Sequence, residues 1–329
     1  MDPAGAPTPT AGMAPGVREG LLAAVAIAVL GALPHVSNDY IVGVGVTAFS
    51  FTVAAVSLNL VYGYSGLLSF AQLAFWGIGG YCAALLVMDA GAPFWLALAA
   101  AATLNAVLAV MVGWPALRLQ RDSFVIVTLS FSLLAFLVAR DWVTLTRGPM
   151  GLPGLPVPEL FGYRFASNNE MYYLAMGWMV AALGVVYAVV SSRIGRTLLA
   201  IKQNQPLALA HGISPTPYRL FAFALGAALT GVAGGIHVFY LKVVDPSILD
   251  FYYIQAWLIM VIIGGAGNFW GVVVAGLVMS ALPEALRFSN ELRMVVYGAV
   301  LVVAVLVLPQ GVVGWLRERR VNRLRADLA

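Results

Sequence analysis

Apolar runs as long as a membrane-spanning helix recur along this 329-residue chain. A helix needs roughly 20 apolar residues to cross the hydrocarbon core of a bilayer. The chain is 61% hydrophobic and 10% charged, whereas soluble domains are about 45–50% apolar and about 25% charged. We therefore expect an all-α, polytopic integral membrane protein.

The same length criterion predicts about ten transmembrane helices. Their expected positions are residues 17–33, 40–62, 66–88, 94–113, 123–139, 171–190, 219–241, two shorter spans within 249–286, and 293–313. The block from 249 to 286 is broken by glycines at positions 264, 265 and 267. Glycine tolerates the positive φ of a tight turn, so we expect a helical hairpin that turns there.

The first apolar run, residues 17–33, has an alternative interpretation as the core of a cleavable signal peptide, which usually spans about 7–15 residues. The run is longer, and residues 1–16 before it carry no basic residue. We therefore favour a retained span. Residues 1–16 are rich in Pro, Ala, Gly and Thr and are expected to form a disordered tail. A transmembrane domain at 17–315 and a basic cytoplasmic tail at 316–329 complete the expected organisation.

Basic residues near the span ends predict the orientation, because Lys and Arg are enriched on the cytoplasmic side. With ten spans and the N-terminus inside, both termini are cytoplasmic. Of the 18 cations, six then lie outside and 12 inside, since 18 less six is 12. Nine carboxylates, Asp245 and Asp250 among them, fall in the outer segments. The last inner cations resemble an anchor beside anionic lipid headgroups, and they are Arg317, Arg319, Arg320, Arg323 and Arg325.

The longest polar interruption in the second half of the chain is residues 191–219. A short helix is expected around 197–201, and Pro206 and Gly212 are expected to interrupt helical structure after it. The segment contains no acidic residue, and its four cations are Arg193, Arg196, Lys202 and Arg219. A basic, partly helical loop between two spans is expected to face the cytoplasm, where a soluble partner can press on it.

The largest expected outer loop runs from residue 140 to residue 170. Its Pro- and Gly-rich centre, residues 148–156, has the chemistry of turns rather than of a helix. A loop of about thirty residues is long enough to be functional. A docking surface for an external protein and a plain connection between spans both remain open.

Several classes of activity are excluded by what the sequence lacks. There is no GxxxxGK[ST] phosphate-binding loop, and the HExxH and GxSxG motifs are also absent. The one cysteine, Cys82, excludes an intrachain disulfide and a CxxC site. The net charge of +4 does not indicate a nucleic-acid partner. We expect a transport protein rather than an enzyme, with no metal site and no cofactor in this chain.

The predicted spans contain essentially no carboxylate, although ion-coupled carriers usually place one inside the bundle. Their interior offers weakly polar side chains that bond between helices at modest strength. Those expected near a passage for a small neutral solute are Asn59, Ser69, Gln72 and Thr128. Glycine clusters at 63–66, 77–80 and 231–235 predict close helix contacts. An ion-coupled secondary carrier and a passive channel are the alternatives to a pump driven from outside the chain.

Five segments, in order, carry a family resemblance. They are residues 58–70, residues 118–129, residues 146–152, residues 192–213, and residues 264–271 together with 309–311. With these segments the chain resembles the membrane-spanning subunits of branched-chain amino acid ABC importers, in the LivM-like branch. The resemblance extends over residues 58–314.

The resemblance implies a multi-pass permease subunit in a bacterial inner membrane. Its expected partners are a homologous second permease subunit, two cytoplasmic ATPase subunits and a periplasmic solute-binding protein. ATP and Mg would be bound by the ATPase partners. The segment 191–219 would then be the coupling segment that sits in a groove of the ATPase. The residues expected to act in coupling are Arg196, Lys202, Gln205 and Gly212.

Three residues depart from the family pattern. Members commonly have a histidine where Gln72 stands, and acidic residues around Asn204 and Gln205. The polarity of the ATPase contact is therefore expected to differ. The solute is left open by the residues, because relatives carry urea, short amides or other hydrophobic amino acids.

Overall fold

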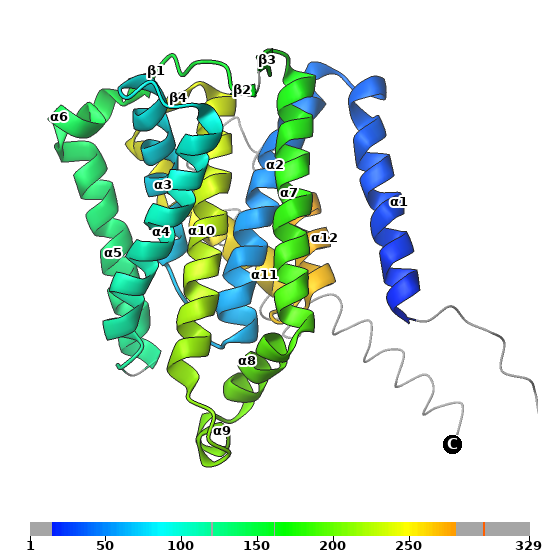
Figure 1. Cartoon of the computed structure of the whole chain (residues 1–329), viewed down its shortest axis with the longest axis vertical. Helices are drawn as coiled ribbons and strands as arrows, with labels where there is room; N and C mark the ends of the chain where they lie inside the picture. The colour runs from blue at the N-terminus through cyan, green and yellow to red at the C-terminus, as the bar shows by residue number, and fades with distance from the viewer. Residues whose placement is uncertain (1–14, 120, 161, 281–298, 300–329) are drawn as a thin grey trace, which may run out of the picture.

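The computed structural model describes residues 15–119, 121–160, 162–280 and 299, and it is a bundle of long helices (Figure 1). Within that part of the chain, six helices are long and apolar enough to cross a membrane. They are α2 (Asp39–Asn59, extended to Tyr64 by a π-helix), α3 (Ala71–Met88), α4 (Phe94–Ala116), α5 (Arg121–Asp141), α7 (Asn168–Ser191) and α10 (Pro215–Leu241). Each coincides with an expected span.

Six further helices lie within the described residues. They are α1 (Pro15–Val36), α6 (Val143–Thr146), α8 (Arg193–Gln203), α9 (Gln205–Ala210), α11 (Phe251–Gly264) and α12 (Phe269–Met279). Helix α1 begins at a proline, which suits the first turn of a helix, two residues before the expected start of the first span. The expected span at 293–313, the tail at 316–329 and residues 1–14 of the N-terminal tail lie outside the described residues.

Helix α10 lies at the centre of the bundle and packs against α2, α3 and α4 (Figure 1). Gly79 of α3 faces the backbone of Gly231, and Gly234 faces the backbone of Trp76, so closely that a Cβ on Gly79 or Gly234 would overlap main-chain atoms. Small residues permit such close contact between helices in lipid. The close packing expected from these glycine clusters is therefore confirmed.

Helix α3 begins five residues later than expected. The chain leaves α2 through the π-helix η1 (Leu60–Tyr64), and it runs without regular structure from residue 65 to residue 70. Gly66 takes a positive φ of 74° in this stretch. Side chains of α5 bind the main chain of Phe70, which supplies the hydrogen bonds that a helix would otherwise make.

The expected glycine turn is confirmed between α11 and α12. Gly265 and Gly267 have φ values of 91° and 95°. Asn268 then caps α12, because its side-chain Oδ1 accepts from the backbone N–H of Gly271 at 3.0 Å. With 14 and 11 residues, these helices are roughly 21 and 16 Å long, so both are shorter than a hydrocarbon core of about 30 Å.

The outer position expected for Asp250 is wrong. After α10, the 3-10 helix η3 (Pro246–Leu249) contacts both α3 and α5. Asp250 follows it and lines a cavity together with Ser132 and Phe136 of α5. The segment therefore enters the bundle, and α11 starts inside the span region instead of at the bundle's end.

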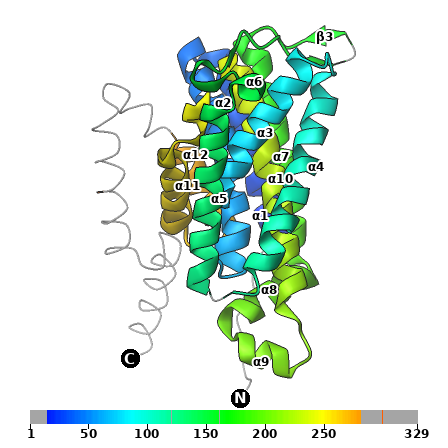
Figure 2. The same cartoon turned by 90° about the vertical axis from the view of Figure 1, so that its left-hand side faces the viewer.

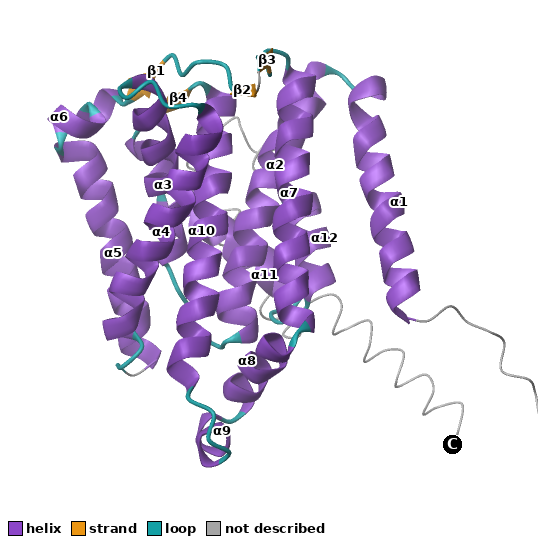
Figure 3. Cartoon of the chain, viewed as in Figure 1, coloured by secondary structure: helices purple, strands orange, loops and turns teal. Residues whose placement is uncertain are grey.

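The bundle carries small strands at one end, so the described fold is almost entirely, but not purely, helical (Figure 3). Strand β1 (Leu152–Pro153) pairs with β4 (Val243–Val244), and β2 (Glu159–Leu160) pairs with β3 (Tyr163–Arg164), both antiparallel. Residues 148–150 form the 3-10 helix η2. Helices α8 and α9 protrude at the opposite end (Figures 1 and 2).

Candidate functional site

The protruding segment, defined as residues 191–219, has one face against the bundle and one facing away. Its helix α8 begins after Ser192, whose Oγ accepts from the backbone N–H of Ile194 at 3.1 Å. One buried stripe consists of Gly195, Leu198 and Ile201. Arg196 is exposed on the other face. The stripe fixes α8 on the bundle while its cationic side stays accessible.

Helix α9 forms the tip of this segment. Asn204 separates it from α8 and caps it, because Oδ1 accepts from the backbone N–H of Leu207 at 3.0 Å. Leu207 and Leu209 are 55% and 51% exposed. Gly212 then takes a φ of 78°, a value that glycine adopts at no steric cost, before α10 begins. The tip thus presents apolar side chains beside the cations of α8.

Lys202 turns inward and ties α8 to the end of α2. Its Nζ donates to the main-chain oxygen of Gly63 at 2.6 Å. Gly63 belongs to the π-helix η1, and π-helices often occur at functional positions. Burial lowers the pKa of the Lys202 ammonium, because desolvation disfavours its charged form.

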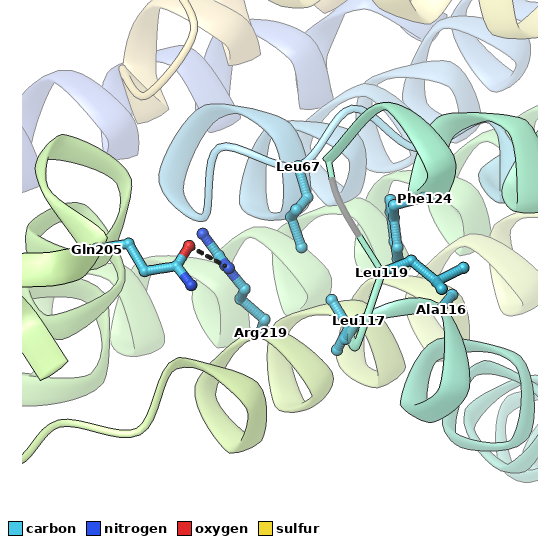
Figure 4. A pocket seen from close by; sticks show the side chains of 7 residues that line it. All are labelled: Leu67, Ala116, Leu117, Leu119, Phe124, Gln205 and Arg219. Atoms are coloured by element: carbon cyan, nitrogen blue, oxygen red, sulfur yellow. Dashed lines mark hydrogen bonds between the residues drawn. The ribbon is translucent and has the colours of Figure 1, made fainter.

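A second contact joins the start of α9 to α10. Nη1 of Arg219, which is buried, donates to Oε1 of Gln205 at 3.0 Å. Both side chains line a cavity of about 280 Å³ between the protruding segment and the start of α5 (Figure 4). The remaining walls are apolar and come from Leu67, Ala116, Leu117, Leu119 and Phe124. The hydrogen bond to the Gln205 oxygen offsets part of the cost of burying this cation.

The four residues predicted for coupling therefore take two kinds of position. Arg196 and Gly212 are exposed, whereas Lys202 and Gln205 are half-buried and bond to the bundle. The sequence carries a signal for Lys202, since it lies four residues after Leu198 and so falls beside the apolar stripe. For Arg219 the sequence predicts a cation at the start of a span, and no sequence pattern predicts that its side chain is buried.

Among the residues predicted to lie near a passage, Asn59 braces the α11–α12 turn. Its Oδ1 accepts from the backbone N–H of Gly267 at 2.9 Å, and its Nδ2 donates to the oxygen of Asn268 at 3.4 Å. A Cβ on Gly63 would overlap the Asn59 side chain and the Gly267 backbone. Lys202, the end of α2 and the hairpin turn therefore meet at one junction, which we call the lysine junction (Lys202, Gly63, Asn59 and Gly267).

Ser69 and Thr128 are brought together on either side of Phe70. Oγ of Ser69 accepts from the backbone N–H of Ala71 at 3.2 Å, and Oγ1 of Thr128 accepts from that of Phe70 at 3.2 Å. Ser132, which the path prediction missed, donates from its Oγ to the oxygen of Phe70 at 2.8 Å. These hydroxyls stabilise the break before α3.

Gln72 lies apart from that cluster, fully buried in the contact between α3 and α10. A Cβ on Gly226 would stand 3.0 Å from its Nε2. Within the described part of the chain, neither side-chain atom of Gln72 has a hydrogen-bond partner. The described residues also contain no group of three His, Cys, Asp or Glu that could hold a metal ion.

Within the described residues, six helices long and apolar enough to cross a membrane and an exposed basic segment at one end are features of a multi-pass membrane protein. The chain belongs to the family described as the branched-chain amino acid transport system permease component, whose model matches residues 40–305. The family indicates a transport subunit in a membrane.

The curated relatives include permeases named LivM and LivH. LivM of Salmonella typhimurium, a high-affinity branched-chain amino acid transport system permease protein, is 28% identical over 322 residues, covering 91% of this chain and 75% of that protein. LivH of Escherichia coli, from the same kind of system, is 29% identical over 295 residues, covering 82% and 93%. The solved PsaBC complex of Streptococcus pneumoniae aligns with a TM-score of 0.42 at 14% identity, covering 80% of this chain and 90% of that one, a likeness too distant to support an argument.

Proposed function

We propose that this chain is the membrane-spanning permease subunit of an ABC importer for branched-chain or similar small amino acids. ATP hydrolysis takes place in partner subunits, which bind the ATP and Mg. Their movement pushes on the protruding segment and opens the bundle alternately to either side. The observation that carries the proposal is the family match over residues 40–305.

The contacts of the protruding segment support such a drive. The hydrogen bond from Lys202 to Gly63 connects it to the end of α2. Its last residue, Arg219, belongs to α10 and bonds to Gln205 of α9, so the segment is also held to α10. A push on α8 and α9 would therefore reach the helices at the centre of the bundle. Close-packed protein interiors have low compressibility and transmit strain.

In this proposal about ten helices cross a bacterial inner membrane, and both termini are cytoplasmic. A homologous second permease, two cytoplasmic ATPase subunits and a periplasmic solute-binding protein complete the transporter. The exposed cations and leucines of α8 and α9 provide the ATPase contact. The loop of residues 140–170, at the opposite end, faces the solute-binding protein.

Reconstitution of the permease pair in liposomes, with and without the ATPase subunits, tests the proposal. We expect leucine accumulation only when ATPase subunits and ATP are both present. Accumulation that survives without ATPase subunits rules the importer out. Downhill equilibration without them would instead identify a passive channel.

One observation favours the alternative of an ion-coupled carrier, namely the position of Asp250 inside the span region. Carboxylates at membrane depth are frequent ligands of coupling ions. An uncoupler added while ATP is held constant separates the two mechanisms. The importer keeps its uptake under this condition, and the ion-coupled carrier loses it.

A further inference from the structure

A small cavity lies between α3, α5 and the start of α11. Its volume is about 190 Å³, below the range of roughly 300–1,000 Å³ that is usual for drug-sized ligands. One carboxylate and one hydroxyl face it, and every other wall is aliphatic or aromatic. The lining residues are Phe70, Leu73, Leu129, Ser132, Leu133, Phe136, Leu249, Asp250 and Phe251.

The cavity lies near the middle of α5, a helix long enough to cross a membrane. Ser132 stands nine residues before Asp141, the last residue of α5, which corresponds to roughly 14 Å along the helix. A hydrocarbon core is about 30 Å thick. A solute held here would therefore be about equally far from both sides, as alternating access requires.

Two interrupted helices meet at this cavity. Residues 65–70 precede α3, and residues 245–250 precede α11, so both helices begin inside the bundle. The rings of Phe70 and Phe251 stack across the gap, with centroids 5.7 Å apart and planes at 18°. Non-helical backbone at membrane depth is tolerated where it is buried in protein or lines a cavity, and discontinuous helices commonly form the solute sites of transporters.

The lining matches the chemistry of an aliphatic amino acid. Asp250 is an exposed carboxylate at the wall, and a carboxylate forms strong, charge-assisted hydrogen bonds with an ammonium group. Leu73, Leu129 and Leu133 offer apolar surface to a branched side chain. The starts of α3 and α11 supply the positive ends of two helix dipoles, which favour the carboxylate of the solute.

We propose that this cavity is the solute site of the permease and that it takes an aliphatic α-amino acid, with the solute ammonium on Asp250. The assignment rests on the proposed function, because it presumes an amino acid as the transported molecule. Beyond the proposed function, it identifies the position of the site, the carboxylate that binds the solute ammonium and the leucines that limit the size of the solute side chain.

Direct binding of radiolabelled leucine to the purified transporter, assembled without the solute-binding protein, tests the site. Asp250→Asn keeps the size of the side chain and removes its charge, so we expect leucine binding to weaken by about 10- to 100-fold, as for loss of a charged hydrogen bond. 4-Methylpentanoate, which has the leucine skeleton without the ammonium, should bind Asp250→Asn at least as tightly as the wild type, because no ammonium is lost and one repelling charge is removed. Asp245→Asn, five residues earlier and outside the cavity, is the matched control and should bind leucine normally.

A second variant tests whether the cavity limits the size of the solute side chain. Leu129→Phe narrows the cavity, so leucine uptake should fall more than alanine uptake, a ratio that a general folding defect would leave unchanged. Unaltered leucine binding in Asp250→Asn, or an equal loss of leucine and alanine uptake in Leu129→Phe, overturns the site.

If wild-type uptake instead needs no ATPase, the proposed function fails while the site can still bind leucine. If wild-type uptake collapses with an uncoupler at constant ATP, Asp250 belongs to an ion site and the assignment is wrong.

Discussion

At the residue scale, the lysine junction explains how one side chain of the protruding segment reaches two helices. Lys202 bonds to Gly63, and Asn59, one turn before Gly63, bonds to the α11–α12 turn. The Lys202 ammonium is partly desolvated, and its hydrogen bond to a main-chain oxygen at the end of a helix offsets that cost. Such oxygens are short of intrahelical partners, so the bond satisfies both groups.

Lys202→Met should uncouple the transporter without dissociating it. Methionine keeps the apolar stem but cannot donate to Gly63, so movement of α8 no longer reaches the end of α2. We expect the amount of bound ATPase to stay constant and the leucine transported per ATP hydrolysed to fall about tenfold, the effect of one lost charged hydrogen bond.

Two further variants make that measurement specific. Lys202→Arg retains a donor and should restore most of the coupling. Gln203→Met changes the exposed neighbouring residue and should leave the ratio as it is. Loss of the ATPase from the Lys202→Met complex would contradict transmission and make Lys202 a docking residue instead.

Sequence reasoning reached some of these residues and not others, for a physical reason. The sequence predicts that Arg196 and Gly212 belong to an exposed basic loop, because the charge of a residue and the tendency of glycine to form turns depend on the residue itself and its neighbours in the sequence. The inward bonds of Lys202 and Arg219 depend on which helix lies opposite each side chain. The position of Asp250 is unpredictable for the same reason. It stands at the edge of an apolar run, and only the packing of the surrounding elements decides whether it lies inside the bundle or at its end.

At the element scale, the contact between α3 and α10 sets the spacing of the core. Gly79→Leu should destabilise the protein, because its side chain would meet the backbone of Gly231, which cannot move aside as a side chain can. Overpacking of this kind costs about 1–3 kcal/mol. A thermal melt of the detergent-purified permease measures the effect as a lowered Tm.

Gly184→Leu is the control for that change. Gly184 lies within α7 and has nothing within 4 Å of its Cβ position. Leucine there should leave the Tm unchanged or raise it, since helix propensity favours leucine over glycine. Equal losses in both variants would show that the close contact of α3 and α10 is not what makes Gly79 sensitive.

The six long spans are predictable because hydrophobic length alone decides them, and the turn at residues 264–268 is predictable because glycines interrupt the apolar run. The late start of α3 is not, because residues 66–70 are mostly apolar and read as part of a uniform span. Their departure from helix depends on Thr128 and Ser132 of another element. The entry of η3 into the bundle likewise depends on contacts with α3 and α5.

At the scale of the whole molecule, the two ends of the bundle differ in charge. The three ion pairs in the described chain, Arg140–Asp141, Arg147–Asp89 and Arg164–Glu159, lie at the end that carries the strands. The protruding segment at the opposite end has cations and no carboxylate. This asymmetry favours a cytoplasmic position for α8 and α9, where ATPase subunits are available.

The side on which α9 lies is the most direct test of this account. Leu207→Cys, made in a Cys82→Ala background so that it is the sole cysteine, places a thiol on the exposed tip of α9. A membrane-impermeant thiol reagent should label it in inside-out membrane vesicles, and bound ATPase subunits should protect it. Labelling from the periplasmic side, or labelling that bound ATPase leaves unchanged, would contradict a drive that acts through the protruding segment.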